Sequence, residues 1–114
     1  MKLNVYVAVT DMERAVVFYR AVFEREPVLH SDRFSAFQVG DAQFGLMNKS
    51  AYAHPLTVGN SCVPDFEVSD IDAEHDRITP IAARITEIIP VGPFRLFMFT
   101  DADGNVLEFH SQPA

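Results

Sequence analysis

Apolar and polar residues alternate in several short stretches of this chain, and two further stretches repeat with the period of a helix. Between residues 3 and 9 every odd position is apolar, which is typical of a strand with one buried face. Thr10 and Glu13 follow with the spacing of a capping box, so we expect a helix to begin there and to end near Phe23. The apolar stripe of that helix consists of Met12, Val16, Tyr19 and Phe23.

The other elements are shorter, and turn residues separate them. The further predicted strands are residues 28–30, 34–39, 42–47, 63–68, 84–89, 94–100 and 105–110. Ser69 and Asp72 have the capping-box spacing, and we expect a second helix there that ends before Pro80. Asp103-Gly104 is a strong hairpin signal between the last two strands.

The two halves of the chain repeat one unit. NVYVAVTDMERAVVFY at residues 4–19 and VPDFEVSDIDAEHDRI at residues 63–78 both lead from a strand through a Thr/Ser-Asp pair into a helix. Asp11 and Asp70 are 59 residues apart (70 − 11), and so are Asn4 and Val63 (63 − 4). The order β-α-β-β-β therefore occurs twice, which predicts an α+β fold with helices behind a curved, mostly antiparallel sheet. We expect one domain, with module one at about 1–48, a linker at about 49–60 and module two at about 61–114.

Composition narrows the class of protein. With 114 residues, 48% hydrophobic and 22% charged, the chain is typical of a single soluble domain. It has neither a membrane-length apolar run nor a signal segment, and its single cysteine, Cys62, is typical of a reducing cytoplasm. The formal charge of −7 argues against a nucleic-acid partner. That charge would favour a cationic ligand, or it would serve only solubility.

The stretches VTDMERAVVFYRAVF and FTDADGNVLEF, in this order and spacing, resemble the vicinal oxygen chelate superfamily. That superfamily includes glyoxalases, extradiol dioxygenases, fosfomycin-resistance enzymes and bleomycin-resistance proteins, and the resemblance covers essentially the whole chain. It implies two tandem βαβββ modules that form a cup-shaped sheet, and it implies a homodimer. Metal enzymes of the superfamily carry ligands at four inward positions: His or Gln on the first strand, a carboxylate or similar group on the fourth, His on the fifth and Glu on the eighth.

The internal repeat assigns these four positions in this chain. They hold Asn4, Gly45, Val63 and Glu108, and only Glu108 matches a ligand of the superfamily. Divalent metals bind imidazole nitrogens and carboxylate oxygens, whereas valine and glycine side chains have no donor atom and an amide oxygen is a weak ligand. We therefore expect no bound metal and no other cofactor.

The resemblance places a ligand pocket on the inward face of the strands. The candidate pocket residues are Asn4, Tyr6, Asp65, Phe97, Phe99, Glu108 and His110. Glu108 and His110 are two residues apart on one strand face, so they have the types and spacing of an acid–base pair or of a site for a cation. Asp65 would make the same face acidic, and the phenylalanines, with Phe34 or Phe37, would stack on an aromatic ligand.

Each of these assignments has a structural alternative. Glu108 would instead pair with Arg95 or a hydroxyl group, and Glu67 would point to solvent. A row of phenylalanines is more often plain core. The remaining histidines are expected to be non-functional, His30 and His54 at the surface and His75 partly buried with its hydrogen bonds satisfied. A nucleophilic role for Cys62 is unsupported, because no His or Asp lies beside it in sequence.

Two functions remain open. The first is a metal-free protein, similar to the bleomycin-resistance branch, that binds a small aromatic or cationic molecule such as an antibiotic in the cup. The second is a metal-dependent lyase or dioxygenase whose ligands are displaced to residues such as His110 and Asp65. Both functions imply a small-molecule ligand and a cytoplasmic protein with no nucleic-acid or membrane partner.

Overall fold

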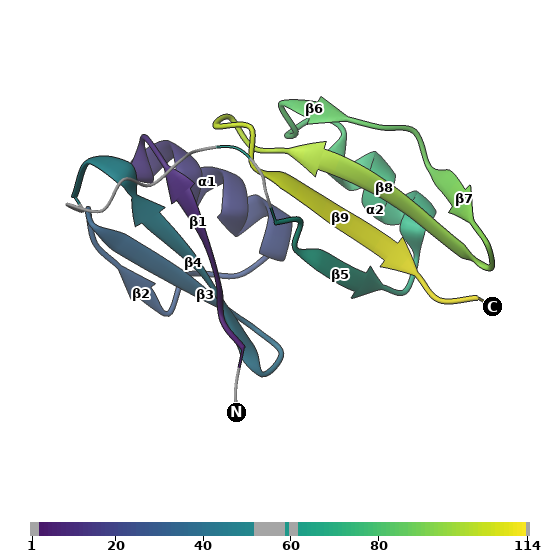
Figure 1. Cartoon of the computed structure of the whole chain (residues 1–114), viewed down its shortest axis with the longest axis horizontal. Helices are drawn as coiled ribbons and strands as arrows, with labels where there is room; N and C mark the ends of the chain where they lie inside the picture. Colours follow the sequence, from purple (N-terminus) through teal and green to yellow (C-terminus); the bar gives the residue numbers. More distant parts are fainter. Residues whose placement is uncertain (1–2, 52–58, 60–61, 114) are drawn as a thin grey trace. The chain divides into compact units, whose positions relative to one another are not determined.

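A computed structural model of the chain describes residues 3–51, 59 and 62–113 (Figure 1). The chain forms two compact units, residues 1–59 and 60–114, and each contains one sheet and one helix of more than one turn. Unit 1 follows the order β-α-β-β-β, and unit 2 has the same order with one of its strands divided in two, which confirms the predicted α+β class. Within the described residues, neither helix has the length and apolar character needed to cross a membrane.

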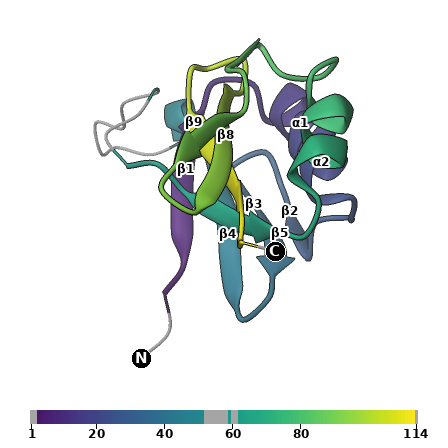
Figure 2. The same ribbon diagram turned by 90° about the vertical axis from the view of Figure 1, so that its right-hand side faces the viewer.

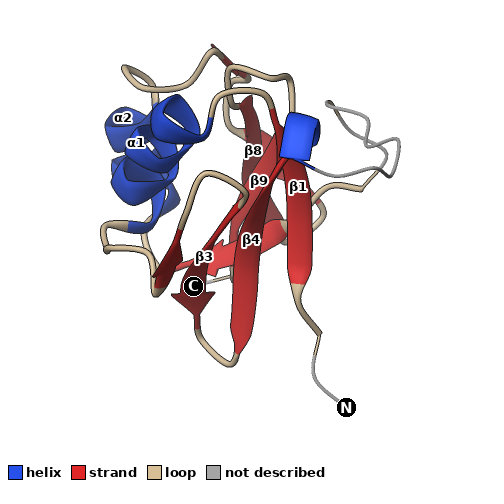
Figure 3. Cartoon of the chain, turned by 90° about the vertical axis from the view of Figure 1, so that its left-hand side faces the viewer, coloured by secondary structure: helices blue, strands red, loops and turns tan. Residues whose placement is uncertain are grey.

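Unit 1 is a four-stranded sheet with a helix on one face (Figure 3). Its elements are β1 (Val5–Val9), α1 (Met12–Phe23), β2 (Leu29–His30), β3 (Phe34–Val39), β4 (Ala42–Asn48) and the short 3-10 turn η1 (Lys49–Ala51). The strand order is β1-β4-β3-β2, in which β1 and β4 are parallel and the other pairs antiparallel. The fully buried side chains between helix and sheet include Val9, Tyr19, Phe37 and Leu46.

Unit 2 repeats this plan with one additional strand (Figure 2). Its elements are β5 (Asp65–Val68), α2 (Ile71–Ile78), β6 (Arg84–Ile85), β7 (Ile89–Val91), β8 (Phe94–Thr100) and β9 (Val106–Ser111). The strand order is β5-β9-β8-β6, β7 also pairs with β8, and β5 runs parallel to β9. The core between α2 and this sheet includes Ile78, Phe97, Phe99, Leu107 and Phe109.

The predicted strand 84–89 is wrong in one respect, because it is divided into β6 and β7. The Thr86 hydroxyl accepts a hydrogen bond from the backbone N–H of Met98 at 3.0 Å and donates to the carbonyl oxygen of Glu87 at 2.9 Å. The Thr86 hydroxyl therefore accepts the hydrogen bond that a backbone carbonyl would accept in a continuous strand, and the strand is interrupted there. β5 likewise begins two residues later than predicted, directly after Pro64, which has no N–H to donate.

Both helices are capped by aspartate and not by the Thr or Ser that precedes it, so the predicted capping boxes are wrong. The carboxylate of Asp11 accepts from the N–H of Arg14, and that of Asp70 from the N–H of Ala73, both at 3.1 Å. Aspartate is as good an N-cap as serine, and its use here shifts each helix start by one residue. Asp72 is thereby free for another partner.

The hairpin predicted at Asp103-Gly104 is present, and it fixes the start of β9. Asp101 is 4% exposed, and one of its carboxylate oxygens accepts from the N–H groups of Asp103 and Asn105, both at 2.9 Å. Its other oxygen accepts from the side-chain amide of Asn105 at 2.8 Å. Gly104 has φ of 86°, a value at which a residue with a side chain would be strained. This network sets the register of β8 against β9.

Candidate ligand-binding face

Four ionisable side chains share one face of the unit 2 sheet. The parallel pairing of β5 with β9 places Asp65 opposite Glu108 and Glu67 opposite His110. Because side chains alternate along a strand, all four lie on the face opposite to the buried Leu107 and Phe109. We call the face formed by Asp65, Glu67, Glu108 and His110 the polar face.

His110 lies between two of these carboxylates. Its Nδ1 is 2.7 Å from the Oδ2 of Asp65, and its Nε2 is 3.8 Å from the Oε1 of Glu67. The amide of Gln112 donates to the same Glu67 oxygen at 2.6 Å. Glu67 thus stays at the exposed edge, as its structural alternative predicted, but it is held by a defined partner. A protonated His110 would donate a hydrogen bond to Asp65 and would attract Glu67 through its charge alone.

Glu108 differs from an ordinary surface carboxylate. Burial raises the pKa of its carboxyl group above the ordinary value, and the hydrogen bond and negative charge of Asp65 raise it further. His110 acts in the opposite direction, but more weakly. The neutral form of Glu108 therefore persists to a higher pH than that of a carboxyl group on an open surface.

Apolar side chains of β8 adjoin the polar face. Met98 is opposite Glu108 and Leu96 is opposite His110. Phe94 meets the imidazole of His110 edge to face, with ring centroids 6.0 Å apart, and is 37% exposed. The carboxylates thus have an aromatic ring and a thioether as neighbours.

Phe97 and Phe99 do not belong to this face, so their prediction as rings that stack on a ligand is wrong, although Phe99 borders a hollow of unit 2. They are 0% and 1% exposed, and they pack on Phe109 at centroid distances of 5.6 and 5.1 Å. Residues 94–99 are apolar at nearly every position, so alternation alone gave no face for this strand. Counting back from the hairpin turn would have placed Met98, and not its phenylalanine neighbours, beside Glu108.

In unit 1 the corresponding positions are occupied differently. Tyr6 is opposite Gly45, as Asp65 is opposite Glu108 in unit 2. A Cβ atom at Gly45 would lie 2.5 Å from the Tyr6 ring and 2.8 Å from the Phe34 ring, and these rings contact each other edge to face at 5.5 Å. The two rings therefore fill the space that a ligand side chain at position 45 would need.

The four positions that bind metal in the superfamily do not fit a metal ion here. The Asn4 side-chain oxygen accepts from the N–H of Gln43 at 3.1 Å, and Gly45 is covered by aromatic rings. Val63 has no donor atom, so Glu108 is the single suitable group of the set. In the described part of the chain, no three His, Cys, Asp or Glu side chains are grouped to hold a metal ion. Asp65 and His110, the candidates for displaced ligands, are bound to each other.

The other residues considered from the sequence have structural roles. The Arg95 guanidinium makes a bidentate pair of hydrogen bonds to the Asp72 carboxylate, at 2.9 and 3.0 Å. Its predicted pairing with Glu108 is therefore wrong. These hydrogen bonds lower the pKa of Asp72. His75 is half-buried with its Nε2 2.8 Å from the carbonyl oxygen of Thr86, as expected. His54 lies outside the described residues.

His30 and Cys62 have no part in the polar face. The Nδ1 atom of His30 is 2.9 Å from the hydroxyl oxygen of Ser35 in unit 1, and its ring lies at the surface as expected. Cys62 is an exposed free thiol that precedes β5.

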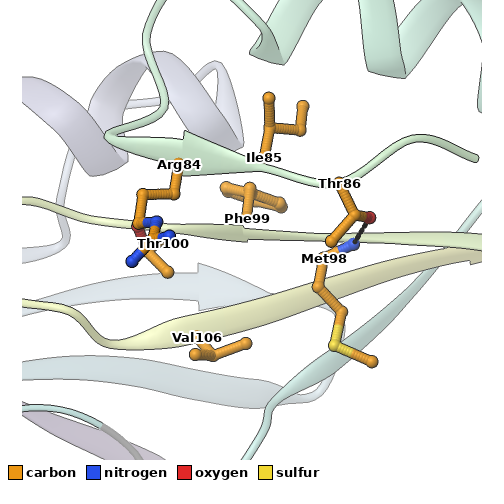
Figure 4. Close-up of a pocket in the computed structure, with 7 residues that line it drawn as sticks. All are labelled: Arg84, Ile85, Thr86, Met98, Phe99, Thr100 and Val106. Carbon is orange, nitrogen blue, oxygen red and sulfur yellow. Dashed lines mark hydrogen bonds between the residues drawn. The ribbon is translucent and has the colours of Figure 1, made fainter.

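A hollow of about 360 Å³ adjoins the polar face within unit 2 (Figure 4). Its lining residues are Arg84, Ile85, Thr86, Met98, Phe99, Thr100 and Val106. Met98 belongs to both regions, because it is opposite Glu108 and also lines the hollow. The sequence reasoning missed this hollow, since it lies across three strands whose pairing is not evident from alternation.

Two βαβββ modules, each with a helix on one face of a mixed sheet, define a glyoxalase-like α+β protein. Residues 3–109 match the family model of the Glyoxalase/Bleomycin resistance protein/Dioxygenase superfamily. The chain belongs to this superfamily, which is the vicinal oxygen chelate group that the sequence motifs resemble.

Solved structures show the same fold at low sequence identity. A solution NMR structure of an Agrobacterium tumefaciens protein has a TM-score of 0.86 and 18% identity, covering 100% of this chain and 98% of that one. The fosfomycin resistance protein FosX from Mesorhizobium loti has a TM-score of 0.75 and 20% identity, covering 97% and 91%. A lactoylglutathione lyase from Agrobacterium tumefaciens has a TM-score of 0.79 and 17% identity, covering 97% and 92%. A search of curated protein sequences gave no significant match.

Proposed function

We propose that the protein is a metal-free small-molecule-binding protein of the glyoxalase/bleomycin-resistance type. Its polar face would bind the cationic group of the ligand. The observation that carries this proposal is the pair of carboxyl groups of Asp65 and Glu108, which face each other on adjacent strands beside His110. Two adjacent carboxylates repel each other unless a proton or a cation lies between them. A bound cationic group would offset this repulsion and favour the ionised form of Glu108.

The neighbours of the polar face favour an aromatic cation over a small inorganic ion. The exposed Phe94 ring, 6.0 Å from the imidazole of His110, and the side chain of Met98 supply apolar contact next to the carboxylates. Aromatic faces attract organic cations in addition to their hydrophobic contribution. A metal ion would gain nothing from these groups, because it needs nitrogen or oxygen donors in fixed geometry.

Structural neighbours supply context for the ligand. FosX is a fosfomycin resistance protein, and another neighbour is a lactoylglutathione lyase. Their likeness to this chain supports the scaffold, and it makes an antibiotic one candidate ligand. We further propose that the protein acts as a homodimer in the cytoplasm.

The test is calorimetric titration with benzamidine, an aromatic cation, and with benzamide, its neutral analogue. We expect the wild type to bind benzamidine measurably and benzamide at least tenfold more weakly. Glu108→Gln should weaken benzamidine binding, whereas Asp41→Asn, which removes one charge from an exposed turn of unit 1, should not. Equal binding of the two compounds would refute the cation site. Metal near one equivalent in protein purified without chelator would overturn the metal-free assignment in favour of a metal enzyme.

A further inference from the structure

The hollow of unit 2 contains two hydrogen-bond donors side by side. Arg84 on β6 is directly opposite Thr100 on β8, and Thr100 is in turn opposite Val106 on β9. Figure 4 shows the Arg84 side chain extended over Thr100, on the side of the strand that carries Met98 and Val106. The volume of about 360 Å³ is sufficient for a small organic molecule.

Neither donor has a partner in the described part of the chain. The Arg84 guanidinium makes no hydrogen bond or ion pair with another described residue, and the same holds for the Thr100 hydroxyl. By contrast, the Arg95 guanidinium on the neighbouring strand β8 donates two hydrogen bonds to the Asp72 carboxylate. A guanidinium group offers planar, paired N–H donors that match a carboxylate or a phosphonate.

The lining of the hollow determines which ligand fits these donors. No carboxylate is among its lining residues, so a bound anion would meet no repulsion from within the hollow. Met98 and Val106 supply an apolar wall beside the guanidinium. An inorganic anion would use the donors and leave this wall uncovered, whereas an organic anion would use both.

We propose that this hollow binds the anionic group of a small organic acid, a carboxylate or a phosphonate. Arg84 donates two hydrogen bonds to that group, Thr100 donates a third, and the organic part covers Met98 and Val106. This site differs from the cation site on the polar face and does not depend on it. The two adjoin each other at Met98, so each can be tested with its own probe.

The probe is phenylphosphonate, titrated into the full chain and followed by calorimetry and by backbone amide NMR shifts. The wild type should bind it, with the largest shifts at Met98, Thr100 and Val106. Arg84→Gln should weaken binding at least tenfold, and Thr100→Val should weaken it severalfold. The matched control, Arg95→Gln, removes a positive charge from the same sheet and should change the affinity less than twofold.

Melting temperatures of all variants show whether each remains folded. If Arg84→Gln unfolds the protein, Arg84→Lys replaces it, and it should bind phenylphosphonate severalfold more weakly because a lysine lacks the planar fork. Equal affinity of the wild type and the folded Arg84 variant would overturn the proposal. Shifts confined to other strands, or no binding at millimolar phenylphosphonate, would overturn it as well. None of these outcomes depends on whether benzamidine binds.

Discussion

Asp65 and Glu108 stand opposite each other on the parallel strands β5 and β9, and the proximity of Asp65 contributes to the raised pKa of Glu108. Burial of the Glu108 carboxyl group is the largest cause of that shift, and it favours the protonated form. Because the pKa of Glu108 is raised in the folded protein, its protonation state should affect both the free energy of unfolding and ligand binding as pH changes.

Glu108→Gln should remove part of the pH dependence of stability. In the folded protein the pKa of Glu108 is raised above its ordinary value of 4.5, so the folded state holds a proton that the unfolded chain releases. The free energy of unfolding contributed by this group is therefore complete below pH 4.5 and falls as pH rises through the raised pKa. Urea unfolding between pH 4 and 8 should show this decline in the wild type. Parallel curves for wild type and variant would contradict the prediction.

Gly45→Ala should destabilise unit 1 by roughly 1–3 kcal/mol, the usual cost of forcing an extra methyl group into a packed site. The new Cβ atom would lie within 2.8 Å of the Tyr6 and Phe34 rings. Tyr6→Ala opens the same space, so the double variant should lose less stability than the sum of the single variants. Denaturant unfolding of all four proteins measures this coupling. Additive effects would show that the rings do not exclude a side chain at position 45.

Phe97→Ala and Phe94→Ala should have opposite profiles. Phe97 is 0% exposed, and its truncation should lower the free energy of unfolding by about 3–5 kcal/mol. Phe94 is 37% exposed beside His110, so its truncation should weaken benzamidine binding and change stability little. Calorimetric titration and thermal melting of both variants check this. A large loss of stability in Phe94→Ala would place its ring in the core.

Asp101→Ala should lower the free energy of unfolding by about 2–4 kcal/mol. The substitution leaves buried N–H groups of the hairpin without an acceptor and removes a charge-assisted network. Asp103→Ala is the matched control in the same turn. The N–H of residue 103 is the group that donates there, and alanine keeps it. Similar losses in both variants would mean that the turn sequence, and not the Asp101 carboxylate, holds β9 in register.

The fold followed from the sequence because its signals are local. Alternation, turn residues and the 59-residue repeat gave all of the main elements, and β3 and β8 agree with their predicted bounds at both ends. Asp65, Glu108 and His110 were also placed together, because parallel pairing of the repeat's first and last strands brings them to one face. What failed was the assignment of faces on β8, where both sets of alternate residues are apolar.

Arg84 and Arg95 show why the rest was not predictable. Both are arginines of unit 2, and nothing in the sequence around them states which has a carboxylate partner. The partner of Arg95 became available only because Asp70, not Ser69, caps α2 and leaves Asp72 in the first turn. Side-chain pairing of this kind depends on the register of the strands and on which residue caps the helix. The alternation of apolar and polar residues predicts neither of these.

The contrast between Tyr6–Gly45 and Asp65–Glu108 bears on how such a protein acquires new specificity. The internal repeat gives the chain two equivalent strand pairs. In the pair of unit 1, the rings of Tyr6 and Phe34 fill the space that the carboxyl groups occupy in unit 2. In the filled pair the two aromatic rings pack against Gly45, so a change there would act first on stability. Under the proposed function, substitutions on β5, β8 and β9 would change the accepted ligand one residue at a time, and the packing of unit 1 would stay as it is.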